Sequence, residues 1–165
     1  MAALKFSKTN KKTGFSLLDV IFAVGITMVG LVAMLSLLRY VVVAGRVSNE
    51  KFMANHLAQE GIEMVRGIRD SNWLGGRTWN EGLGVGTYRA QYNSGSLLPY
   101  ANLPLKRDSS GFYNYNSTGT DTKFYRTIYI YSGSDSIDVV SEVRWTETLG
   151  QFATVIEDKL YNWMP

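Results

Sequence analysis

The first third of the chain is a basic stretch followed by a long apolar one. Residues 20–38 form a run of 19 positions without a charged side chain. As a helix this run rises about 28 Å, at ~1.5 Å per residue, close to the ~30 Å hydrocarbon core of a bilayer. Four of the residues before it are lysines: Lys5, Lys8, Lys11 and Lys12. Because basic residues stay on the cytoplasmic side, the pattern predicts a single-pass membrane helix with a cytoplasmic N-terminus.

Three interpretations of this segment compete. A cleaved secretory signal has an apolar core of about 7–15 residues and a small-residue cleavage site after it. Here the run is longer, and residues 41–45 are a poor cleavage site. A plain signal anchor fits the length and charge but does not account for Asp19, a carboxylate at the apolar end that needs a partner. In the third interpretation, cleavage at Gly14 occurs on the cytoplasmic side and the helix stays in the mature protein.

Beyond Arg39 the pattern becomes amphipathic. Apolar or small side chains recur every three or four residues, at Met53, Leu57, Gly61, Val65 and Ile68. Polar side chains, His56 among them, fill the other face, and Glu63–Arg66 and Arg66–Asp70 are at the spacing of helical ion pairs. The pattern therefore predicts one helix from about residue 15 to about residue 70, ended by Gly75 and Gly76.

The second half of the chain has the alternation of β-strands. Strands are predicted at 87–92, 123–131 and 137–145, while 151–160 suits either a strand or a helix. Residues 94–102 and 106–121 are predicted as loops, with a possible short strand at 112–115. Turns are predicted at 135–136 and 149–150. Consecutive strands joined by short turns predict an antiparallel meander whose apolar face is covered by the stripe of residues 53–68, an α+β fold.

The net charge does not indicate a nucleic-acid partner. The formal charge is +3, from 17 Lys+Arg and 14 Asp+Glu. The four leader lysines precede Gly14, so without them 13 Lys+Arg face 14 Asp+Glu and the charge is −1. The basic character therefore belongs to the leader, and a phosphate-binding surface loses its electrostatic support.

The residue types for catalysis and for tight metal binding are scarce. There is no cysteine and a single histidine, His56, predicted on a solvated helix face. Residues 82–86 are glycine-rich but lack the lysine and the strand–turn–helix context of a phosphate cradle. Oxygen-bearing side chains at 108–121 offer a weak calcium site, with a solvated turn favoured. Seven of the eight tyrosines between 88 and 131, all except Tyr100, offer a stacking surface, with core and edge packing favoured. The sequence predicts no enzyme, no cofactor and no metal.

Residues 12–20 carry a more specific signal. The stretch Lys12-Thr13-Gly14-Phe15-Ser16-Leu17-Leu18-Asp19-Val20, with the basic leader before it and the apolar run after it, resembles the class III signal of type IV pilins and type II secretion pseudopilins. One difference is that Asp19 stands where the family usually has glutamate. Residues 58–63, Ala-Gln-Glu-Gly-Ile-Glu, are similar to a stretch of minor pilin-like proteins, which favours that subgroup.

The resemblance implies a set of partners and roles. It implies that a prepilin peptidase cuts between Gly14 and Phe15 and methylates the new amine of Phe15. It implies that Asp19 pairs with the N-terminal amine of a neighbouring subunit during assembly. It also implies an inner-membrane assembly platform, other pilin subunits in a helical filament, and membrane lipid around the helix before assembly. The location would be the cytoplasmic membrane first and an extracellular filament afterwards.

The hydrophobic pattern and the family resemblance together predict four segments. Residues 1–14 are the leader, 15–48 the membrane or filament-core helix, 49–74 the amphipathic half of the helix, and 75–165 the antiparallel sheet region. The expected function is that of a structural pilus subunit, with a major pilin as the alternative within the family. The alternative from another class is a membrane-anchored extracytoplasmic binding domain such as an adhesin, which would keep its leader.

Overall fold

The computed structural model describes residues 14–116, 118–147 and 150–163. It contains one long helix and eight strands, which confirms the predicted α+β fold. Their bounds in chain order are α1 Leu17–Leu74, β1 Gly86–Arg89, β2 Leu98–Pro99, β3 Lys106–Arg107, β4 Tyr113–Asn114, β5 Thr120–Asp121, β6 Tyr125–Ser132, β7 Ser136–Glu147 and β8 Gly150–Tyr161. The chain divides into two compact units, one up to Arg46 and one from Val47 onward, and α1 contributes to both.

The larger sheet has five antiparallel strands in the order β2-β1-β6-β7-β8. Its centre is the predicted meander: β6 pairs with β7 and β7 pairs with β8 along their whole lengths. Residues 151–160 are therefore a strand, which settles the choice that the sequence left open. The predicted turn at 149–150 lies partly outside the described residues. The first predicted strand is shorter than expected, since β1 ends at Arg89.

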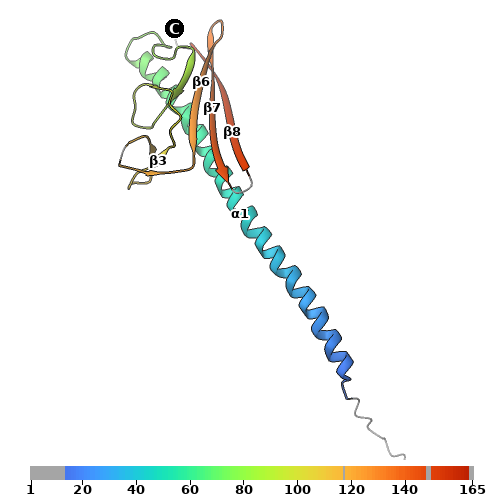
Figure 1. Ribbon diagram of the computed structural model, residues 1–165. Coiled ribbons are helices and arrows are strands. Elements are labelled where there is room, and N and C mark those ends of the chain that lie inside the picture. Colours follow the sequence, from blue (N-terminus) through green and yellow to red (C-terminus); the bar gives the residue numbers. More distant parts are fainter. Residues whose placement is uncertain (1–13, 117, 148–149, 164–165) are drawn as a thin grey trace, which may run out of the picture. The chain divides into compact units, whose positions relative to one another are not determined.

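The C-terminal half of α1 lies against one face of this sheet (Figure 1). The helix residues that are buried there are Ala54, Leu57, Ala58, Gly61, Ile62, Val65, Ile68 and Asn72. The predicted cover is thus confirmed, with one correction: Met53 is exposed and Ala54 takes its place in the buried stripe. Only the first position of the stripe was placed one residue too early, because Met53 and Ala54 are both apolar and only packing decides which of them faces the sheet.

The helix ends four residues later than predicted, at Leu74. Gly76 adopts a φ of 65°, and the amides of Gly76 and Arg77 donate to the carbonyls of Trp73 and Asn72 at 3.0 and 2.9 Å. This is the hydrogen-bond pattern of a Schellman C-cap with glycine in the left-handed position. The predicted role of the glycines is confirmed, and polar residues 70–72 remain helical.

One of the two predicted helical ion pairs is present. Arg66 pairs with Glu63 at 2.6 Å, but its other contact is Asp158 of β8 at 2.9 Å. Asp70 pairs instead with Arg69. The prediction of an Arg66–Asp70 pair was wrong because it considered α1 alone, whereas β8 supplies a carboxylate to Arg66 from the sheet.

Two of the predicted loops contain short strands. Residues 94–102 include β2, and residues 106–121 form a second sheet of three strands in the order β4-β3-β5. Asp108 closes its first hairpin, because its carboxylate accepts hydrogen bonds from the amides of Ser110 and Phe112 and from the side chain of Asn114. The possible short strand predicted at 112–115 is β4, whereas β2, β3 and β5 were not predicted because two-residue strands carry too little alternation. The first hairpin depends on side-chain bonds as well.

Candidate functional site: the first turn and apolar face of the helix

The predicted processing and assembly residues lie at the start of the described chain. Gly14, Phe15 and Ser16 precede α1 in an irregular conformation, and Phe15 is 93% exposed. Asp19 lies in the first turn of the helix. The predicted leader, residues 1–13, lies outside the described residues. The structure therefore places Gly14, Phe15 and Asp19 within six residues at one helix end, with the predicted cleavage position in accessible chain.

Asp19 has a local partner that the sequence reading missed. Its carboxylate accepts a hydrogen bond from the amide of Ser16 at 3.1 Å, and the Ser16 hydroxyl accepts one from the amide of Leu18 at 3.4 Å. The Ser16-to-Asp19 bond is one half of a capping box, with aspartate in place of the usual glutamate or glutamine, while the Ser16 hydroxyl caps the amide of Leu18. A negative charge in the first turn also interacts favourably with the helix dipole. The Ser-x-x-Asp spacing before an apolar run was the available signal.

The apolar part of α1 has no cover within its unit. All described residues up to Arg46 are exposed, including every large apolar side chain from Leu17 to Val43. Its most apolar 18-residue window has a mean hydropathy of 2.5, so this helix is long and apolar enough to cross a membrane. Gly25 and Gly30 have open space where a Cβ would lie. A water-facing helix with this surface is unfavourable, at about 25 cal/mol per Å² of exposed apolar area.

In the second unit, α1 and the sheet approach each other closely at Gly61. A Cβ at this position would lie 2.4 Å from the Ser141 hydroxyl and 2.8 Å from a methyl carbon of Ile128. The glycine therefore lets the helix backbone approach β6 and β7 more closely than any side chain would permit.

A buried arginine joins the same elements. The side chain of Arg126 on β6 has no exposed surface and pairs with Glu60 at 2.8 Å. It also donates to the carbonyls of Leu57, at 3.0 Å, and Ala90, at 2.6 Å. Burying a guanidinium is costly unless it is paired and hydrogen-bonded, and here three oxygens from α1 and the segment after β1 accept from it. The sequence reading assigned Arg126 only to a strand, since nothing local marks a buried cation.

An ion triad lies near the beginning of the second unit. The Lys123 ammonium contacts the carboxylates of Glu50 on α1 and Glu147 at the end of β7. Burial opposes the charged form, but the hydrogen bonds to Glu147 and Glu50 outweigh it and raise the pKa of Lys123 above its ordinary value of 10.5. Glu50 lies just before the part of α1 that the sheet covers, and Ile68 lies near the other end of that part. The triad therefore links α1 to the sheet where the covered stretch begins.

The weaker candidates from the sequence, which are the oxygen ligands, His56 and the tyrosines, do not come together as a functional site among the described residues. Among the described residues no three His, Cys, Asp or Glu side chains gather as a metal site. His56 is exposed and packs edge-on against Phe52, with ring centroids 4.3 Å apart. The tyrosines are distributed between faces: Tyr88 packs against the core, whereas Tyr92 and Tyr131 are exposed.

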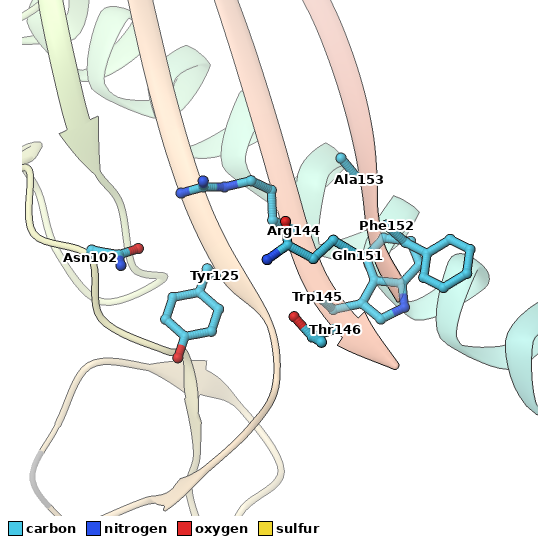
Figure 2. Close-up of a pocket in the computed structure, with 8 residues that line it drawn as sticks. All are labelled: Asn102, Tyr125, Arg144, Trp145, Thr146, Gln151, Phe152 and Ala153. Carbon is cyan, nitrogen blue, oxygen red and sulfur yellow. The ribbon is translucent and has the colours of Figure 1, made fainter. Parts of the chain in front are cut away.

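The sheet also carries a solvent-open hollow on the face turned away from α1 (Figure 2). It has a volume of about 360 Å³. Its lining comes from β6, β7, β8 and the segment between β2 and β3, and consists of Asn102, Tyr125, Arg144, Trp145, Thr146, Gln151, Phe152 and Ala153. The rings of Trp145 and Phe152 stack on each other in the helix-side cluster, so the polar residues of this set form the open side.

Comparison of the chain with protein-family models, with curated proteins and with solved structures finds no match. What the residues and geometry of this chain support directly is an α+β protein with one candidate membrane helix near its N-terminus.

Proposed function

We propose that this protein is a structural subunit of a type IV pilus or a related type II secretion-like filament, and a minor rather than a major subunit. In this proposal a prepilin peptidase removes residues 1–14 and methylates the amine of Phe15. The helix then leaves the bilayer and packs against the helices of other subunits, while the sheet faces outward. The chain itself catalyses no reaction.

The observation that supports the proposal best is the exposed apolar surface of α1 up to Val43, on a chain whose second unit already has its own core. Such a surface needs lipid or other apolar helices around it. A filament subunit requires both environments in turn. The position of Gly14 and Phe15 in accessible chain directly before the helix is also what a peptidase acting at the membrane surface requires.

Substitutions at Asp19 distinguish a local role as a helix cap from an intermolecular role in assembly. If the acid only caps the helix, asparagine at this position keeps the hydrogen bond to the Ser16 amide and assembly continues. If its charge pairs with the methylated amine of a neighbour, both Asp19→Asn and Asp19→Ala reduce incorporation into filaments, while Asp19→Glu restores it. The proposal predicts the second result, with membrane insertion unchanged in all three variants.

The test is quantification of the chain in sheared surface filaments and in the membrane fraction of the native organism. Depletion of Asp19→Asn from filaments, with normal amounts in the membrane, is the expected outcome. Wild-type incorporation of Asp19→Ala would contradict the assembly role. A wild-type chain found only in the membrane would favour the alternative, a membrane-anchored extracytoplasmic binding domain.

A further inference from the structure

The hollow in Figure 2 is built from a regular row of side chains on the outer sheet face. Tyr125 on β6 lies opposite Arg144 on β7, and Arg144 lies opposite Ala153 on β8. Thr146 and Gln151 form the next cross-strand pair. Because side chains of directly paired residues share a face, these five lie together, and Asn102 adds a wall from outside the sheet. All of them belong to the second unit of the chain.

Four neutral polar side chains around this hollow are without a partner among the described residues. Asn102, Tyr125, Thr146 and Gln151 make no side-chain hydrogen bond within the described part of the chain. A second hollow on the same face differs in this respect, because Asp138 and Lys159 in its lining pair with each other at 3.2 Å. The first hollow therefore collects amide and hydroxyl groups that both donate and accept, all of them available to a ligand.

The hollow also holds a cation. Among the described residues that line it, Arg144 alone is charged, and its side chain is 46% exposed. The carboxylate closest to it belongs to Glu142, at 3.8 Å, and this group already accepts a hydrogen bond from the Tyr129 hydroxyl at 2.9 Å. A guanidinium with free N–H groups matches a carboxylate in a two-point hydrogen-bonded pair.

We propose that this hollow binds an acidic sugar, a uronic-acid residue of a polysaccharide. The carboxylate would pair with Arg144, and the ring hydroxyls would bond to the side chains of Asn102, Thr146 and Gln151, while the Tyr125 ring faces the apolar side of the sugar. Its volume lies within the range of about 300–1,000 Å³ for small-molecule sites. A sugar ring presents several adjacent hydroxyls that each donate and accept, which matches this set of amides and hydroxyls, and an acidic peptide is the competing ligand in the test. The inference does not depend on filament assembly.

The test is ligand-observed NMR and calorimetry of the full chain in detergent micelles, with D-glucuronate and D-galacturonate as probes. D-glucose and D-galactose are the neutral counterparts, and the tripeptide Gly-Asp-Gly represents a protein carboxylate. Saturable binding of at least one uronate is expected, with its neutral counterpart and the peptide each about tenfold weaker or more. No uronate binding, or equal binding of the neutral sugar or the peptide, would overturn the proposal.

Substitutions in the hollow test whether the uronate binds there. Arg144→Gln should weaken uronate binding by about tenfold or more, because the positive charge and the two-point guanidinium donor are lost while a polar side chain remains. Lys159→Gln is the matched control, a cation removed from the same face outside the hollow, and should leave binding unchanged. If Arg144→Gln lowers the melting temperature, Gln151→Ala takes its place with a weakening of at least about threefold expected from one lost hydrogen bond. Unchanged binding in a folded Arg144→Gln or Gln151→Ala variant would overturn the proposal.

Discussion

At the scale of single residues, two glycines of α1 have different roles. Replacing Gly61 tests close packing against the sheet, and replacing Gly67 tests helix propensity alone. Gly61 lies where a Cβ would meet side chains of β6 and β7, whereas Gly67 has nothing within 4 Å of that position. We expect Gly61→Ala to lower the free energy of unfolding by about 1–3 kcal/mol through overpacking. Gly67→Ala should raise it by up to about 1 kcal/mol, because alanine is the better helix former.

Urea unfolding of both variants, followed by the near-ultraviolet signal of the core aromatic residues, measures this difference. Opposite signs are expected for the two substitutions. If Gly61→Ala stabilised the protein as Gly67→Ala does, the helix could not lie as close to the sheet as the structure has it.

Arg126 is the second residue whose role can be isolated. Arg126→Met keeps an unbranched side chain in the core but removes the donors to Leu57, Ala90 and Glu60. We expect a loss of about 2–4 kcal/mol in unfolding free energy, since the buried carbonyls of Leu57 and Ala90 each lose a donor while Glu60 keeps access to water. Arg77→Met, at an exposed position with only a 3.9 Å ion pair, is the control and should change stability by less than about 0.5 kcal/mol.

At the scale of elements, the Lys123 triad predicts a pH dependence of the contact between α1 and β7. The folded-state pKa of Lys123 is raised above 10.5, so the folded protein holds this proton more tightly than the unfolded chain. Its contribution to stability is therefore fully present below about pH 10.5 and is lost as the pH rises further through the folded-state pKa. Chemical unfolding of the wild type between pH 9 and pH 12 should show this loss.

The Lys123→Gln variant should show a shallower decline over the same pH interval, with Lys51→Gln, at an exposed position of α1, as the control. Both variants are compared with the wild type at each pH because tyrosines titrate there as well. Equal slopes for wild type and Lys123→Gln would contradict the triad.

The element scale is also where the sequence was most informative. Long periodic segments such as β6, β7 and the stripe of α1 were predicted because their apolar side chains repeat over many residues. Of the small sheet, only β4 was predicted, as a possible short strand at 112–115, and β3 and β5 were missed because each has two residues. At the candidate site, Gly14, Phe15 and Asp19 were identified from a motif, but the hydrogen bond from Ser16 to Asp19 was not. Contacts such as Arg66–Asp158 join residues far apart in the chain, and no local pattern encodes them.

At the scale of the whole molecule, the account rests on the fate of the N-terminal helix. Its exposed apolar surface is explained by a membrane, by a filament, or by both in succession. The subunit proposal requires that the leader be removed while the helix is retained, and neither a plain anchor nor a secretory signal shares this property. The position of the mature N-terminus therefore separates the three.

Mass spectrometry of the intact chain, purified from surface filaments and from membranes of the native organism, measures that position directly. The account predicts a filament form that begins at Phe15 with one added methyl group on its amine and still contains α1. A chain that keeps residues 1–14 and occurs only in the membrane would contradict it.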